Sequence, residues 1–452
     1  MAKYKVYPEY KDSGVEWLGD IPEHWEVFTG KRIFQSVRTP ALKHDEQLAA
    51  SQKFGVIPQS LMMQLNDSKV MLALKGTDSF RHVDENNFVI SLRSFEGGIE
   101  HSKYSGCVSP AYTVLKNIKQ LSYGYYRYLL KCAPFIAALQ SSTDSLRDGK
   151  SINYEQFSAI FLPIASIFEQ AQIAAFLDYE TAKIDKLIEK QQQLIELLKE
   201  KRQAVISHAV TKGLNPDVPM KDSGVEWLGE VPAHWKVAPL KHLCSLIKDG
   251  THLPPPRVDK GVPLLSVRNI INGKFNFRDD DSQISYKDYK SLCSSFIPKK
   301  DDVLLAIVGA TLGKVALVPE MESFHIQRSL GVFRTNELVQ SQQLSYIFES
   351  KNFQNLLWGN VGFSAQPGIY LGTLANFSIP VPPINEQTKI IEFISNAVNK
   401  LDHLLAQTAQ FTSLMQERRT ALISAAVTGK IDVRDWVAPE AREVEVLQEV
   451  TA

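Results

Sequence analysis

The stretch that decides the fold, Pro163–Leu214, reads PIASIFEQAQIAAFLDYETAKIDKLIEKQQQLIELLKEKRQAVISHAVTKGL, and a second copy occupies Pro380–Ile431. The copies align without a gap at an offset of 217 residues. Identical residues at matching positions include Glu169–Gln170 with Glu386–Gln387, Asp185 with Asp402, and Arg202 with Arg419. The chain therefore carries an internal repeat in two copies, which is far from a solenoid, because a solenoid needs at least three short repeats.

Apolar residues in each copy occupy the a and d positions of a heptad, which predicts a long amphipathic helix of about 40 residues, or roughly 60 Å. They are Leu177, Ile184, Leu187, Leu194, Leu198 and Val205, and then Ile394, Leu401, Leu404, Phe411, Met415 and Leu422. One heptad position is polar in both copies, Gln191 and Thr408, and a polar residue there fixes register. We expect the two helices to pair as an antiparallel coiled coil; the alternative is that each packs on a globular body.

A second, shorter repeat precedes each long one. KDSGVEWLGDIPEHWEV covers Lys11–Val27, and KDSGVEWLGEVPAHWKV covers Lys221–Val237. We interpret each as a compact hook whose tryptophans are buried against the helix ends or the neighbouring domain. This role is structural, and a functional role for the tryptophans is the alternative. The tryptophans are Trp17, Trp25, Trp227 and Trp235.

The segments between the repeats do not align with each other, which suggests one scaffold with two different working surfaces. Short apolar runs cut by Gly or Asn turns, followed by helical patches, predict two mixed α/β (α+β) domains. The expected order is a first domain with its repeated segment at 1–162, a helix at 163–210, a second domain with its repeated segment at 211–379, a helix at 380–430, and a tail at 431–452.

The composition of the chain limits the classes of protein to which it can belong. The 452 residues carry 50 basic and 50 acidic side chains, so the net charge is zero. This disfavours a free-standing DNA binder, although a local basic groove or shared phosphate contacts remain compatible with it. We expect no membrane contact and a cytoplasmic protein, because there is neither a spanning run nor an apolar signal core. The four cysteines form no CxxC pair, which predicts reduced thiols and no zinc site.

Motifs for catalysis fail on inspection. GATLGKV at Gly309 has three residues between its glycines and Val315 after Lys314, whereas a phosphate loop needs four residues and a Ser or Thr. SPAY at Ser109 differs from an amino-methyltransferase tetrapeptide by Ala111. No His, Asp or Glu cluster has metal-ligand spacing. We therefore expect no catalytic, cofactor or metal site in this chain.

From about Tyr10 to Asp435, the chain resembles the specificity subunit of type I restriction–modification enzymes. The resemblance rests on both hooks, on PPINEQ before the second helix and RRTALISAAVTGKI at its end, and on DGTHLPPP, VRNIINGKF and DVLLAIVGATLGKVALV in the second insert. In the first insert only FVISLRSFEGGIE and GCVSPAY carry it, and residues 39–83 are not diagnostic.

The resemblance implies two target-recognition domains, each reading one half of a bipartite site in double-stranded DNA. The paired helices would set the spacer between the half-sites. Two adenine-N6 methyltransferase (modification) subunits, which use S-adenosylmethionine, would dock on the pseudo-two-fold frame. Two restriction subunits, motor-nucleases that use ATP and Mg²⁺, can join such a complex.

Reading bases requires polar side chains on loops that reach a groove, most informatively the major groove. Our candidates in the first domain are Arg93 and Ser94. Those in the second are Thr251, His252, Arg268, Asn269, Thr311, Lys314, Gln327 and Arg328. Lys314 suits phosphate better than base. The alternative role for Arg268 or Arg328 is a salt bridge at the end of a strand. The alternative role for Thr251–His252 is the cap of a turn.

Two other classes stay open on the sequence. One is an enzyme with an unrecognised methyltransferase or nuclease site, which methyl transfer by the chain alone would reveal. The other is a coiled-coil scaffold that binds proteins without DNA, which an absence of sequence preference in a DNA-shift assay would favour.

Overall fold

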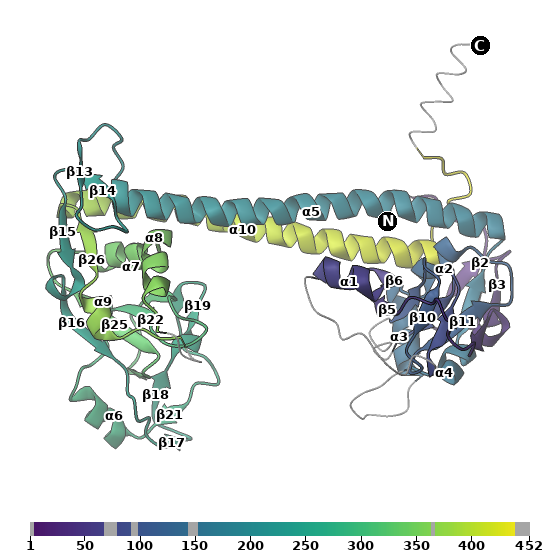
Figure 1. Cartoon of the computed structure of the whole chain (residues 1–452), viewed down its shortest axis with the longest axis horizontal. Coiled ribbons are helices and arrows are strands. Elements are labelled where there is room, and N and C mark those ends of the chain that lie inside the picture. Colours follow the sequence, from purple (N-terminus) through teal and green to yellow (C-terminus); the bar gives the residue numbers. More distant parts are fainter. Residues whose placement is uncertain (1–3, 67–78, 92–97, 143–151, 363–366, 439–452) are drawn as a thin grey trace, which may run out of the picture. The chain divides into compact units, whose positions relative to one another are not determined.

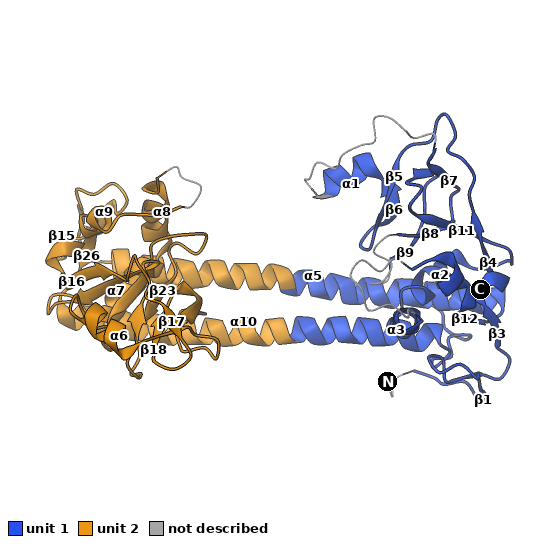
Figure 2. Cartoon of the chain, turned by 90° about the horizontal axis from the view of Figure 1, so that it is seen from below, with its two compact units in different colours: residues 1–191, 411–452 blue, residues 192–410 orange. Residues whose placement is uncertain are grey.

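The chain forms two compact units, the first made of residues 1–191 and 411–452 and the second of residues 192–410 (Figure 2). The computed structural model describes residues 4–66, 79–91, 98–142, 152–362 and 367–438. Each unit combines one insert with a portion of both long helices. None of the helices in these described ranges has the length and apolarity needed to cross a membrane.

The two repeats form the long helices α5 (Ile167–Lys212) and α10 (Ile384–Val427), which pack against each other (Figure 1). In the first unit Arg419 Nε donates to Asp185 at 2.7 Å, and in the second Arg202 Nε donates to Asp402 at 3.0 Å. These are matching positions of the repeat joined crosswise, so the pairing is antiparallel, as predicted. Such exposed ion pairs contribute at most about 1 kcal/mol each, and apolar packing supplies the rest.

Burial along the paired helices departs from the heptad prediction. Leu177 and Ile184 are buried with Leu422 in the first unit, and Ile394 and Leu401 are buried in the second. Four predicted core residues stay more than a third exposed, namely Leu187 and Phe411 in the first unit and Leu194 and Leu404 in the second. A single partner helix covers only one side of the apolar heptad stripe. These four side chains lie on the other side and therefore remain exposed to solvent.

The hooks fold identically. Strand β1 (Tyr10–Asp12) pairs with β2 (Asp20–Pro22), and β13 (Met220–Asp222) pairs with β14 (Glu230–Pro232) in the same antiparallel register. Strand β3 (Glu26–Thr29) pairs with β12 (Phe161–Ile164), as β15 (Lys236–Pro239) does with β26 (Ser378–Val381). Trp25 and Trp235 are fully buried, as predicted, whereas Trp17 and Trp227 are only partly buried.

The Glu-Gln dipeptide at the start of each long helix connects that helix to its surroundings, a role that the sequence did not reveal. Glu169 accepts a hydrogen bond from Trp25 Nε1 at 3.0 Å, and Gln170 accepts one from the Ser122 amide at 2.9 Å. In the second unit Gln387 accepts one from the Gln340 amide at 2.9 Å. Glutamate thus binds the hook, and glutamine binds the amino end of an insert helix.

The first insert is built on a four-stranded sheet. Its order is β4 (Phe34–Val37), β11 (Thr113–Asn117), β8 (Phe88–Ile90) and β9 (Ile99–His101), all antiparallel. Two further pairs are β7 (Arg81–Val83) with β10 (Gly106–Val108), and β5 (Leu48–Ser51) with β6 (Gly55–Pro58). The helices are α1 (Gln59–Asn66), α2 (Tyr123–Leu129), α3 (Ala133–Ser141) and α4 (Tyr154–Ala159).

The second insert contains two sheets and several helices, which agrees with the mixed α/β domain predicted for it. The larger runs β16 (Cys244–Asp249), β25 (Leu330–Thr335), β22 (Val303–Ala306), β23 (Val315–Leu317), β20 (Lys274–Phe275) and β19 (Ile270–Ile271). The smaller runs β17 (Arg257–Val258), β21 (Gln283–Ile284), β18 (Val262–Leu265) and β24 (His325–Ile326). Helices α6 (Tyr286–Cys293), α7 (Ser341–Glu349), α8 (Lys351–Gly359) and α9 (Leu371–Ala375) complete the domain.

Candidate nucleic-acid interface

Several predicted site residues of the second insert meet where β16 and β24 end. Thr251 and Gln327 form an isolated parallel bridge. The Thr251 amide donates to the Ile326 carbonyl at 3.0 Å, and the Arg328 amide donates to the Thr251 carbonyl at 3.1 Å. Gln327 Nε2 donates to the Leu264 carbonyl at 3.4 Å, which adds the end of β18. Backbone bonds thus fix three loops that are distant in sequence at one edge.

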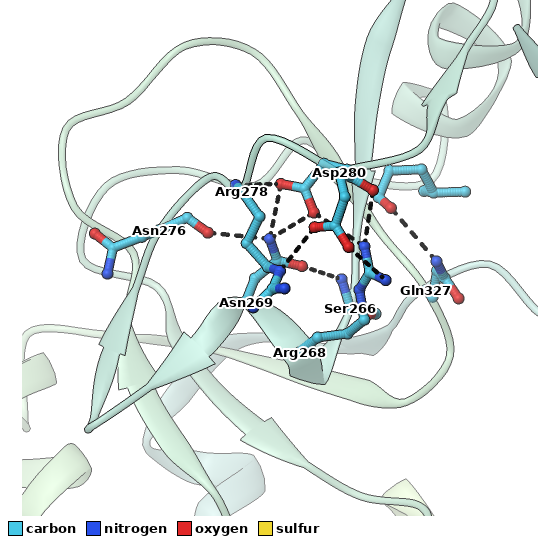
Figure 3. A network of polar contacts seen from close by, with 9 residues as sticks. Ser266, Arg268, Asn269, Asn276, Arg278, Asp280 and Gln327 are labelled. Carbon is cyan, nitrogen blue, oxygen red and sulfur yellow. Dashed lines mark hydrogen bonds and ion pairs between the residues drawn. The ribbon is translucent and has the colours of Figure 1, made fainter. Parts of the chain in front are cut away.

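Asn269 holds the loop after β18 from within. Its side chain is fully buried, and its Nδ2 donates to the Asn276 carbonyl at 3.0 Å and to the Asp281 carboxylate at 2.8 Å. The Ser266 amide donates to its Oδ1 at 3.0 Å (Figure 3). We predicted a base contact for Asn269; in this structure its amide groups are instead used inside the chain.

Arg268 and Arg278 are placed on that loop by one residue, Asp280. Arg268 donates to the Asp280 carbonyl at 3.0 Å, and Arg278 Nε donates to the Asp280 carboxylate at 2.9 Å (Figure 3). The hydrogen bond from Arg278 lowers the pKa of Asp280, and the same bond raises the pKa of Arg278. Asp280 thus orients both guanidinium groups, and each is more than a third exposed. The side chains can present forked donors to a guanine edge or a phosphate.

His252 and Arg328 lie on the wall of a pocket of about 670 Å³ beside this edge. His252 Nε2 is 2.7 Å from Asp249 Oδ2, so the carboxylate is engaged. Arg328 is exposed, and no acidic side chain of the described residues lies within 4.0 Å of its guanidinium. A cation without a local counter-charge is suited to an anionic ligand.

Thr311 and Lys314 lie elsewhere, in the turn between β22 and β23. Lys314 is exposed and lines a second pocket of about 880 Å³ with Lys274 and Arg202. Neither lysine has an acidic partner within 4.0 Å among the residues that the structure describes, whereas Arg202 pairs with Asp402 and Glu349. Two unpaired lysines, one at the start of β20 and one in the turn before β23, suit phosphate contacts.

Arg93 and Ser94, the candidates of the first insert, lie outside the described residues. In the second insert the sequence pattern missed Arg278, Lys274 and the exposed Tyr370, which lines the same pocket as His252 and Arg328. Arg278 and Lys274 each follow a turn signal, in FNFRDDD and INGKF, and this could have marked them. Exposure of Tyr370 has no local sequence signal.

Chemistry beyond binding has no obvious place in these sites. Within the described ranges, no group of three or more His, Cys, Asp or Glu side chains is arranged to hold a metal ion. Two carboxylates line the larger pocket, Glu349 and Asp402, and both pair with Arg202. Burial raises the pKa of Glu349. The pockets offer donors and cations, which recognise a polar, anionic surface.

Comparison with known proteins decides the family. The model of the type I restriction modification DNA specificity domain matches residues 22–197 and again 232–410. The chain belongs to this family. It is a DNA specificity subunit of a type I restriction–modification system, and such subunits are non-catalytic.

Several relatives of this specificity subunit span more than nine-tenths of its length. The type I restriction enzyme MjaVIII specificity subunit of Methanocaldococcus jannaschii is 24% identical, over 92% of this chain and 95% of its own. A solved chain from work on complex assembly and conformational transition of the type I R-M system has a TM-score of 0.71 at 14% identity, covering 91% of this chain and 99% of that one. The HsdS subunit from Thermoanaerobacter tengcongensis has a TM-score of 0.51 at 14% identity, covering 91% and 98%. The two structures share the fold.

Proposed function

We propose that each insert reads one half of a bipartite DNA site, and that the edge around Arg328 is the reading edge of the second insert. The observation that carries this proposal is the convergence of Thr251, His252, Gln327 and Arg328 from separate loops, with Arg268 on the adjoining one. Hydroxyl, imidazole, amide and guanidinium groups are those that distinguish base edges in the major groove.

Phosphate contacts would come from the other pocket. Lys314 and Lys274 are unpaired cations there, and Thr311 lies in the same turn as Lys314. Such contacts position a protein on the duplex without reading it. In the first insert, Arg93 and Ser94 remain our proposal for base contacts, and Asn269 is proposed to act by holding the Arg268 loop.

We further propose that two modification subunits bind the long helices. The support is a matched set of exposed apolar residues, Leu187, Phe411 and Leu414 in the first unit and Leu404, Leu194 and Leu197 in the second. Leu197 is 61% exposed and Leu414 50% exposed, and the two are equivalent in the repeat. Helical partners with apolar faces would cover them. S-adenosylmethionine, and ATP with any restriction subunit, would then be bound by those partners.

Alanine variants of Arg328 and Lys314, in complex with the methyltransferase partner, test the reading edge against the phosphate site. Arg328→Ala should weaken binding about tenfold or more and relax base preference in one half-site, since a good bidentate contact discriminates by about 1–3 kcal/mol. Lys314→Ala should weaken binding to every sequence equally and lower the slope of log K against log salt by about one. Unchanged binding by both variants would contradict the proposal.

A further inference from the structure

Two large apolar side chains of the second insert, Leu253 and Tyr370, are almost fully exposed to solvent. Leu253 is 88% exposed and Tyr370 is 85% exposed, the highest values among the large hydrophobic side chains of the described residues. Both belong to the edge described above. Leu253 follows His252, and Tyr370 lines the pocket that His252 and Arg328 also line. Fully exposed apolar side chains gathered at one functional edge call for a ligand that covers them.

The exposure of Leu253 is built into the backbone. Thr251 Oγ1 donates to the Leu253 carbonyl at 3.0 Å, and the Thr251 amide is bonded to the Ile326 carbonyl. Three prolines, Pro254–Pro256, follow. A residue before proline is restricted to extended conformations, and successive prolines stiffen the chain. Leu253 is therefore held outward by a rigid segment, so little conformational entropy would be lost on binding.

Tyr370 is fixed in a similar way. The Ile369 amide donates to the Ile307 carbonyl at 3.0 Å, and the Tyr370 carbonyl accepts from the Thr373 amide at 3.0 Å at the start of α9. These bonds anchor the backbone on both sides of the residue, while the ring is left in solvent. A rigidly mounted aromatic ring is a good stacking platform.

The charges around these side chains favour nucleic acid as the occupant. Arg328 lacks an acidic partner among the described residues, and the one carboxylate that lines the pocket, Asp249, is engaged by His252. Apolar wedges set beside cations are used to enter a base step and unstack it, and aromatic rings stack on bases. The chain also belongs to a family of DNA specificity subunits, which favours DNA over a protein at this edge.

We propose that Leu253 inserts into a base step of the second half-site and that Tyr370 packs on an exposed base face beside it. This inference rests on the proposed reading edge. Insertion of Leu253 would distort the DNA as well as contact it. The second half-site would then be recognised partly by how easily one of its base steps unstacks. Flexible pyrimidine–purine steps are the class of step that fits.

The test uses the complex with its methyltransferase partner and duplexes that carry the methylated motif, with 2-aminopurine placed in turn at each position of the second half-site. Unstacking raises its fluorescence. We expect a rise of several fold at one step, its loss in Leu253→Ala, and a roughly tenfold weaker affinity in Tyr370→Ala, as removal of one stacking contact predicts. Leu338→Ala and Tyr286→Ala, exposed residues that do not line the pocket of His252, Arg328 and Tyr370, are matched controls that should behave as wild type.

The Arg328→Ala variant separates the two ways in which the experiment can fail. Flat fluorescence at every position, or an unchanged rise and affinity in Leu253→Ala and Tyr370→Ala, overturns the wedge. If Arg328→Ala still weakens binding in that case, the reading edge stands without it. If Arg328→Ala also binds like wild type, the reading edge itself is wrong, and the wedge is wrong with it.

Discussion

At the scale of single residues, two buried glutamines show that a buried polar group can either stabilise or destabilise the second unit. Gln387 is fully buried, accepts from the Gln340 amide and donates to the Pro382 and Leu338 carbonyls. Gln343 in α7 is equally buried, yet neither its Oε1 nor its Nε2 has a hydrogen-bond partner. Burying an amide costs desolvation free energy, and without hydrogen-bond partners this cost is not compensated.

Replacing each glutamine with leucine should therefore have opposite effects. Gln343→Leu should raise the free energy of unfolding of the second unit by about 1 kcal/mol, and Gln387→Leu should lower it by about 2 kcal/mol, because two carbonyls and one amide lose their partner. Urea unfolding followed by a probe in that unit measures both. Destabilisation by both variants to a similar degree would show that Gln343 has a partner in solution.

A partly buried histidine, His101, predicts a pH dependence in the first unit. Burial, followed by Arg127 and Lys103, lowers the pKa of His101 to about 4 from 6.5. The unfolded chain therefore binds the proton more readily. The contribution of His101 to stability is complete above pH 6.5 and is lost as pH falls through about 4. His101→Gln should flatten the dependence of the urea midpoint over this window, and an identical slope in the variant would contradict the pKa direction.

For the residues that we propose to read DNA, the sequence indicated the residue type better than the position in the fold. Loop polar groups such as Gln327 and Arg328 could be proposed from the strand and turn pattern, and they do meet at one edge. That Asn269 is buried, or that Tyr370 is exposed, depends on contacts between distant segments. No local pattern contains this information.

At the scale of elements, the long helices were the most predictable part because the heptad is a local signal that persists for many turns. Their antiparallel pairing followed from the repeat. The burial of Leu187, Leu194, Leu404 and Phe411 was overpredicted, because a heptad marks apolar positions without saying how many neighbours cover them. The open flank left on each unit is where we place the modification subunits.

Charged substitutions on this flank test that placement. Leu197→Glu and Leu414→Glu should each remove one of two modification subunits, and the double variant should remove both, because an ionised carboxylate cannot be buried against an apolar partner. Native mass spectrometry measures the stoichiometry. Glu196→Lys, one position away on an exposed face of α5, is the control and should keep two. Two bound subunits in the double variant would place the docking surface elsewhere.

At the scale of the whole molecule, a duplicated frame with divergent inserts suits a protein that must read two unrelated sequences with equivalent partner geometry. The spacer between half-sites should then depend on the helices alone. Deletion of seven residues from both helices, near Gln191 and Thr408, keeps the heptad in phase and shortens each by two turns. The methylated motif should keep both half-sites with a shorter gap; altered half-site bases would refute this assignment of the spacer.

The most direct measurement of the central claim is single-molecule sequencing for N6-methyladenine in a host with and without this chain, its modification partner being present in both. We predict a split motif of two short specified halves around an unspecified gap. The motif should vanish without the chain, and Arg328→Ala should relax the base preference of one half. A methylation pattern that is indifferent to the chain, or a single uninterrupted motif, would contradict it.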